Sequence, residues 1–213
     1  DGYINAIDLD SDNDTCKDVL EAGFLDPNLD GFLGGLPILV SPFGVVTSGM
    51  GYTTPNANYI VPTPITIITD IGQGIGICNL RSTTITIQTS AVDGYQWQVS
   101  TDNGASFSDI FDNVNYTGTA TNSLTINIVP NSFNHNVYRV YMSKLNNICG
   151  KYSNYFHLLV HPLPAINTPI SLIQCDDNYD GISVFNLKEK ISFISSNYLT
   201  ETFTFFRTQA GAQ

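Results

Sequence analysis

The chain has 213 residues, of which 42% are hydrophobic and only 13% are charged, and its formal net charge is −11 at pH 7. This hydrophobic content excludes a wholly disordered chain. The strong negative charge argues against nucleic acid and anionic membrane surfaces as partners, because both need a basic face. No apolar run reaches the length of about 18 residues that a membrane-spanning helix requires. Abundant Thr, Ser, Asn, Tyr and Ile favour an all-β protein.

The negative charge is concentrated near the N-terminus. Residues 1–37 contain nine acidic side chains and a single basic one, Lys17. Residues 65–163, in contrast, contain five acids and four bases and are almost neutral. Because carboxylates that lie close together repel one another, the first segment needs a local source of positive charge.

The spacing of these acids matches a calcium-binding loop of the EF-hand type. Such a loop offers side-chain oxygens at positions 1, 3, 5 and 9, a backbone carbonyl at position 7 and a carboxylate at position 12. Counted from the first ligand, the chain places at these positions Asp10, Asp12, Asp14, Asp18, Cys16 (by its carbonyl) and Glu21. Thr15 stands at position 6, where Gly normally makes the sharp turn, which leaves open whether the loop closes. Asp8 is a candidate ligand of a neighbouring ion.

Two further stretches share the first half of this pattern. The first offers ligands at positions 1, 3, 5 and 7, namely Asp26, Asn28, Asp30 and the Phe32 carbonyl. The second offers positions 1, 3 and 5, namely Asp176, Asn178 and Asp180. Both have Gly at position 6, but neither has a carboxylate at position 12. We predict calcium at all three loops; the alternative is a set of solvated Asp-rich turns that need no ion.

The middle of the chain alternates with the period of β-strands. After an uncharged, extended connector at 38–64, strands are expected at 65–69, 83–89, 95–100, 123–128, 137–143 and 155–161. Residues 72–76 are interpreted as a glycine turn between strands. About seven short strands separated by turns predict an immunoglobulin-like β-sandwich over residues 65–161, with Trp97 in its core.

The four cysteines suit disulfides rather than a zinc site, because none forms a CxxC pair. Cys78 precedes the strand expected at 83–89, and Cys149 follows the strand expected at 137–143. Since those strands run antiparallel in such a sandwich, we expect a Cys78–Cys149 disulfide. Cys16 and Cys175 are left open: they pair with each other, with cysteines elsewhere, or stay free.

The remaining residues, 162–213, are predicted to form a Pro-rich linker and an incomplete third β module, with a strand at 201–208. We interpret the chain as an internal fragment of a longer protein. It contains no G-x-S-x-G, H-E-x-x-H or P-loop motif, so no enzyme activity is expected. Tyr116 and Tyr152 are candidate surface aromatics that could stack on sugars, although such residues more often belong to the sheet itself.

Several stretches resemble modules of giant cell-surface adhesins of Bacteroidetes. "DLDSDNDTCKDVLEAGFLDPNLDGFLG" resembles thrombospondin type 3-like calcium repeats, and residues 1–37 are assigned to a calcium-binding segment of this type. "YQWQVSTDNGASFSDI" resembles the immunoglobulin-like module of these proteins, and "CDDNYDGISVFNLKEKI" the modules that precede a gliding-motility-associated type B sorting domain. Thr15 is the clearest departure from the calcium repeats.

This resemblance implies export by type IX secretion and display at the bacterial cell surface, outside the cell. It also implies a role in adhesion or gliding motility, an outer-membrane anchoring or secretion partner, and an unidentified surface or glycan ligand. The alternative function is that of accessory carbohydrate-binding modules in a secreted polysaccharide-degrading enzyme.

Overall fold

The structure, a computed structural model, describes residues 8–35, 37, 39–43, 46–47, 54–168, 170–173, 175–176 and 180–212. Its contacts divide the chain into two units, Asp1–His161 and Pro162–Gln213. The first unit contains strands β1 (Ile67–Thr69), β2 (Gly74–Cys78), β3 (Thr83–Thr86), β4 (Gln88–Thr89), β5 (Gly94–Ser100), β6 (Ser108–Asp109), β7 (Tyr116–Thr117), β8 (Ser123–Ile126), β9 (Val137–Lys144), β10 (Asn147–Tyr152) and β11 (Phe156–His161).

These strands form an immunoglobulin-like sandwich, as the sequence predicts. The larger sheet has the order β2-β11-β9-β5-β6, with β10 paired to β9, and a three-stranded sheet has the order β3-β8-β7. β1 and β4 form a separate pair. The core between the sheets is one cluster of buried side chains that includes Ile85, Trp97, Leu124, Ile126, Val140 and Leu158. The all-β fold class is therefore confirmed.

Alternation along the central strands β5 and β9 explains how this core forms. Trp97 is fully buried and lies opposite Val140 in the ladder, while Gln98 lies opposite Arg139 on the outer face. The Trp97 indole N–H donates to the Thr121 carbonyl at 2.8 Å, which satisfies the one polar group that burying this side chain brings inside. The prediction of a core Trp97 is correct.

The glycine turn expected at residues 72–76 is wrong, because most of this stretch belongs to β2. β2 pairs in parallel with β11, with Gly74 opposite His157 and Cys78 opposite His161. A Cβ at Gly74 would lie 2.2 Å from the His157 carbonyl oxygen, and φ at Gly74 is +146°. Glycine is therefore required here by the close approach of the neighbouring strand rather than by a turn.

Gly74→Ala is expected to destabilise the sandwich by about 2–3 kcal/mol, because both the backbone conformation and the contact with β11 must change. Gly72→Ala is the matched control, since φ there is +82° but a Cβ would meet nothing within 4 Å. Urea unfolding followed by Trp97 fluorescence measures both losses. Equal losses in the two variants would show that the approach to β11 contributes nothing.

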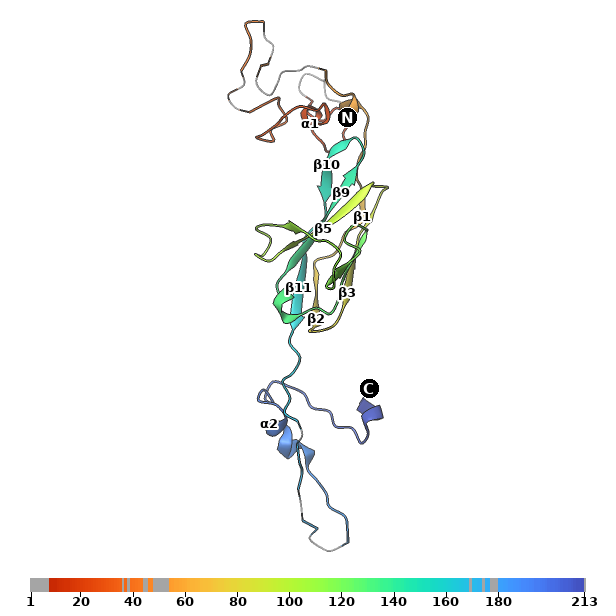
Figure 1. Cartoon of the computed structure of the whole chain (residues 1–213), viewed down its shortest axis with the longest axis vertical. Coiled ribbons are helices and arrows are strands. Elements are labelled where there is room, and N and C mark those ends of the chain that lie inside the picture. Colours follow the sequence, from red (N-terminus) through yellow and green to blue (C-terminus); the bar gives the residue numbers. More distant parts are fainter. Residues whose placement is uncertain are drawn as a thin grey trace. The chain divides into compact units, whose positions relative to one another are not determined.

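The N-terminal part of the first unit has its own small core. Helix α1 (Asp18–Glu21) buries Val19 against Ala22, Phe24 and Leu33, and Tyr59 of the 3-10 helix η2 (Asn58–Ile60) packs on this cluster. Within the connector, Val40 and Val46 form an isolated antiparallel bridge. In Figure 1, α1 lies beyond the β9–β10 end of the sheet, while β2 and β11 reach the opposite end.

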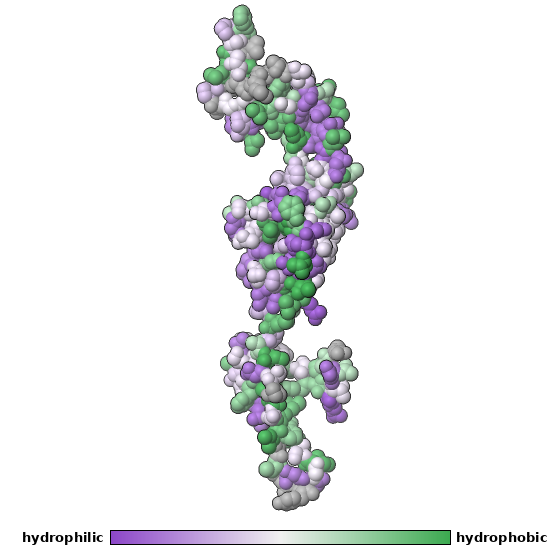
Figure 2. Space-filling view, in the orientation of Figure 1, coloured by the Kyte–Doolittle hydropathy of each residue, from purple (hydrophilic) through white to green (hydrophobic). Residues whose placement is uncertain are grey.

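The second unit is built differently from the third β module that the sequence predicts. Its described residues form the short helices η4 (Leu187–Lys190), α2 (Ile191–Ile194) and η5 (Gln209–Ala212), with one bridge between Ile166 and Ser195. The described stretch 201–208 pairs with no strand, so the strand expected there is wrong. Large apolar side chains of this unit are exposed, among them Ile173, Val184 and Leu199. Figure 2 shows green, hydrophobic surface over this part of the chain.

Candidate metal centre

The first acidic loop closes in the way that its spacing predicts. The carboxylate of Asp10 accepts hydrogen bonds from the backbone N–H of Asp14 and of Thr15, each at 3.1 Å. Thr15 has φ +78° and Asn13 has φ +58°, so both residues adopt the left-handed conformation. The loop therefore turns sharply at position 6 with Thr in the place of Gly.

This conformation predicts that Thr15→Gly stabilises the loop. A β-branched residue with positive φ is strained by about 1–3 kcal/mol, while Gly costs about 0.5–1 kcal/mol in backbone entropy. A net gain of about 1 kcal/mol is expected in urea unfolding. Asn13→Gly is the control, because Asn tolerates this conformation and should gain much less. No gain at Thr15 would contradict the strain.

Three carboxylates gather at the centre of the loop, and two buried side chains point to a missing positive charge. Single oxygens of Asp10, Asp12 and Asp14 lie within 4.8 Å of one another. Both carboxylate oxygens of Asp12 and both of Glu21 are inaccessible to solvent and have no hydrogen-bond partner. Glu21 is only 2% exposed. Buried carboxylates without partners are costly, so this donor set fits a hard cation such as calcium.

The pKa values of these two side chains reflect the same shortage of positive charge. Burial raises the pKa of Glu21 to about 8, and the negative charges of Asp14, Asp12, Asp10 and Asp18 add to this shift. The pKa of Asp12 is also raised, first by burial and then by Asp14. The carboxylate of Glu21 lies outside the 4.8 Å set but within the electrostatic field of the loop.

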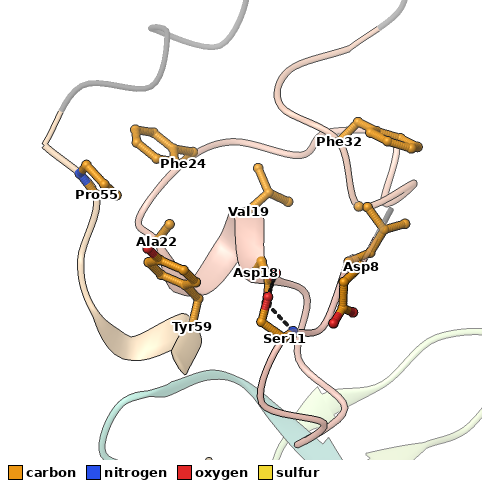
Figure 3. Close-up of a pocket in the computed structure, with 11 residues that line it drawn as sticks. Asp8, Ser11, Asp18, Val19, Ala22, Phe24, Phe32, Pro55 and Tyr59 are labelled. Atoms are coloured by element: carbon orange, nitrogen blue, oxygen red, sulfur yellow. Dashed lines mark hydrogen bonds between the residues drawn. The ribbon is translucent and has the colours of Figure 1, made fainter. Parts of the chain in front are cut away.

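Asp18 and Asp8 lie at the edge of this centre. The two oxygens of Asp18 accept from the Ser11 N–H at 2.7 Å and from the Ser11 hydroxyl at 2.6 Å, so Asp18 holds the loop closed (Figure 3). Asp8 accepts from the Asp10 N–H at 3.0 Å. Both acids line a cavity of about 330 Å³ whose apolar wall includes Phe24, Phe32 and Tyr59. Ligation by Asp8 and Asp18 stays a prediction.

The loop is joined covalently to the sandwich, in a pairing that the sequence did not predict. Cys16 forms a disulfide with Cys149 of β10, so the expected Cys78–Cys149 disulfide is wrong; Cys78 is free and exposed, as is Cys175. β10 pairs with the C-terminal half of β9, whereas β11 pairs with its first residues and runs on toward Cys78. The two cysteines therefore lie at opposite ends of the sheet. With the Cys16 thiol in the disulfide, its carbonyl is the group left for a cation.

A hydrogen-bonded contact reinforces this covalent link. Asp14 Oδ1 accepts from the Cys16 N–H at 3.0 Å, inside the loop. Asp14 Oδ2 accepts from the backbone N–H of Thr63 at 2.9 Å, from the Thr63 hydroxyl at 3.1 Å and from Asn147 Nδ2 at 3.4 Å. Thr63 and Asn147 carry no signal in the sequence that would connect them with an acidic loop.

The second loop repeats the backbone pattern of the first. Asp26 accepts from the N–H groups of Asp30 and Gly31 at 3.1 and 2.8 Å, and Asp30 accepts from the Phe32 N–H at 2.8 Å. Asn28 Nδ2 donates to the Asp30 carboxylate at 2.6 Å. This loop is thus shaped for a cation, but the inaccessible, unpartnered carboxylates that mark the first loop are not found among its described side chains.

The third loop is described in part. Asp176 accepts from the Gly181 N–H at 2.7 Å, and Asp180 accepts from the Ile182 N–H at 2.8 Å. Gly181 has φ +78°, the same conformation as position 6 of the other loops. Asn178 lies outside the described residues. Calcium at the second and third loops stays a prediction.

The outer face of the larger sheet carries a group of aromatic side chains around one arginine. The Arg139 guanidinium lies 3.9 Å from the Phe107 ring centroid and 4.1 Å from that of Tyr152, and its Nε donates to Gln98. Phe107 in turn packs against Tyr155. Tyr152 is 45% exposed. Tyr116 belongs to the core instead, where its ring stacks on another aromatic, so it is not a surface aromatic.

Comparison with known proteins found solved structures of low similarity to this chain. No family model and no curated protein matches the chain. The twitchin kinase region from C. elegans is 18% identical, with 46% of this chain and 16% of that one covered and a TM-score of 0.35. A structure on Dscam isoform specificity is 9% identical, with 45% and 24% covered and a TM-score of 0.39. The fold assignment rests on the strand pairing. Across the described residues, no helix has the length and apolar character needed to cross a bilayer.

Proposed function

We propose that this chain is a non-catalytic segment, stabilised by calcium, of an extended bacterial cell-surface adhesin. The first acidic loop binds calcium through Asp10, Asp12, Asp14 and Glu21. The ion neutralises carboxylates that otherwise repel one another at the contact between the loop and the sandwich. It thereby holds the N-terminal segment in one arrangement on the sandwich.

One observation carries the calcium part of this proposal. Asp12 and Glu21 bury four carboxylate oxygens without a hydrogen-bond partner among the described residues. The backbone N–H of Asp14 lowers the pKa of Asp12, but burial outweighs this effect. Buried unpartnered carboxylates persist when a cation compensates them, and oxygen ligands at EF-hand spacing favour calcium. The hydrogen bonds that Asp10 accepts from Asp14 and Thr15 also support a calcium site. They hold the loop in its curved conformation, and the carboxylates of Asp12 and Glu21 take no part in them.

The adhesin part rests on the resemblance of the modules to Bacteroidetes surface proteins. Export by type IX secretion, anchoring at the outer membrane and a role in attachment or gliding belong to the same proposal. Antibodies raised against this chain are expected to label intact cells of the source bacterium, and labelling should disappear when type IX secretion is disrupted. Labelling only after lysis would contradict display at the surface.

Calorimetric titration of the purified chain with calcium tests the ion site. We expect saturable binding, and slower proteolysis within residues 8–35 in calcium than in excess chelator, because bound ligand stabilises the folded state. Magnesium at the same concentration is the control, since it demands a stricter octahedral site. Absence of calcium binding, with equal cleavage in both conditions, would overturn the proposal.

A second candidate is carbohydrate binding by the outer face of the larger sheet. Tyr152, whose ring contacts the Arg139 guanidinium, and Tyr155, which packs on Phe107, are both partly exposed. They favour this candidate, because aromatic surfaces with a nearby polar group are frequent at binding sites. A polysaccharide panel tests this candidate, with Tyr152→Ala as the variant. A panel without any bound polysaccharide would exclude it.

A further inference from the structure

The two oxygens of Asp14 have different surroundings. Oδ1 lies within the loop and accepts from the Cys16 N–H. Oδ2 is turned to the sandwich, where Thr63 provides two donors and Asn147 a third. Asp14 is only 1% exposed, so water does not replace these donors. A single buried carboxylate therefore belongs both to the acidic loop and to the surface on which the loop rests.

Asn147 is itself held rigidly. It is 6% exposed, and it begins β10 opposite Lys144. Its Nδ2 also donates to the Thr63 carbonyl at 3.1 Å, and its Oδ1 accepts from the Gly150 N–H at 3.0 Å. Every polar atom of this side chain is thus engaged, which fixes the direction in which it donates to Asp14.

The acidic loop and β10 are joined a second time, two residues further along each segment. Asp14 and Asn147 are 133 residues apart in the sequence, and so are the disulfide partners Cys16 and Cys149. The loop segment 14–16 therefore follows 147–149 in a constant register, fixed at one point by hydrogen bonds and at the other by a covalent bond. Rotation of the loop about the disulfide would break the contact of Asp14 with Thr63 and Asn147.

We infer that Thr63 and Asn147 are positioning residues for the cation site, and that calcium binding and docking of the loop on the β9–β10 hairpin stabilise each other. This inference rests on the proposed calcium function of the loop. Outer partners that hydrogen-bond a ligating carboxylate fix its orientation, and their loss typically reduces metal affinity about 10- to 100-fold. Because coupling between two events is reciprocal, calcium must also protect the hairpin.

Calcium titration of the whole chain tests the first half of the inference. Asn147→Ala is expected to raise the calcium Kd about 10-fold, and Thr63→Val, which removes only the hydroxyl donor, to raise it less. Thr66→Val is the matched control, since Thr66 is exposed and its hydroxyl contacts neither Asp14 nor Asn147. Trp97 fluorescence verifies that each variant retains the folded sandwich.

Hydrogen exchange of the whole chain tests the reciprocal half. Amides of residues 140–152 are expected to exchange more slowly in calcium than in chelator, and this difference should shrink in Asn147→Ala. If the natural chain binds no calcium, the proposed function fails. If it binds calcium but Asn147→Ala binds equally well and the hairpin shows no protection, the coupling is wrong while the calcium function stands. If Asn147→Ala does not fold, the same two measurements on Thr63→Val test the coupling.

Discussion

Glu21→Gln is expected to stabilise the protein in chelator and to remove most of the stabilisation that calcium provides. Without a cation, burial and the surrounding acids raise the pKa of Glu21 from the ordinary 4.5 to about 8. At pH 7 this shift costs the folded state on the order of 3 kcal/mol, which a neutral Gln does not incur. With calcium, the same substitution removes the carboxylate at position 12, so affinity should fall at least 10-fold.

The pH dependence of the chelated protein has a defined sign. Because the folded-state pKa of Glu21 lies above the unfolded one, the unfolded state releases its proton first. Stability in chelator should therefore fall as pH rises from about 4.5 to about 8, whereas Glu21→Gln should lack this component.

Urea unfolding at several pH values, with and without calcium, measures these effects. Glu201→Gln is the matched control, since it removes one negative charge from the second unit rather than from the loop. A Glu21→Gln variant that is less stable than the natural chain in chelator would refute the argument, as would unchanged calcium affinity.

Removal of the disulfide by replacing Cys16 and Cys149 with Ser should cost roughly 2–5 kcal/mol. The crosslink joins residues 133 positions apart, and closing so long a loop restricts the unfolded chain strongly. The same change frees the acidic loop from the β9–β10 hairpin, so calcium affinity should fall as well. Urea unfolding in the oxidised state and calcium titration measure the two effects.

Cys78→Ser serves as the control for this experiment. Cys78 is free and exposed at the end of β2, so its replacement should change stability by no more than about 0.5 kcal/mol. The pairing described here would be disproved if Cys78→Ser were as damaging as the loss of Cys16 and Cys149. Mass spectrometry of non-reduced peptides identifies the bonded pair directly.

The sequence predicts those parts of the fold in which side chains alternate. In β8 and β11 every second residue is buried, and in β9 the alternation runs from Tyr138 to Met142. In β5, Tyr95, Trp97 and Val99 all pack on the core, although only Trp97 among them is fully buried. The expected ranges agree with these four strands to within one or two residues. β2 could not be predicted in this way, because "GIGIC" alternates glycine with isoleucine rather than polar with apolar side chains. Its strand conformation depends on the neighbour β11, whose close approach only Gly74 permits.

The candidate metal centre was predictable to a similar extent. The spacing of Asp10, Asp12 and Asp14 is local, and it correctly predicts which carboxylates the loop brings together. The contributions of Thr63 and Asn147 were not predictable, because they depend on how the loop docks on a hairpin more than a hundred residues away. The true partner of Cys149 was missed for the same reason.

The Cys16–Cys149 crosslink also determines how the protein would carry mechanical load. Tension that enters along the chain at Cys16 passes through the disulfide to Cys149 and leaves along β10 and β11. The residues between the two cysteines, which include β1 to β9, lie off this path. At about 3.5 Å per residue, roughly 450 Å of chain thus cannot be extended as long as the disulfide is intact. An oxidised chain would therefore act under load as a short tether with most of its sandwich shielded from extension.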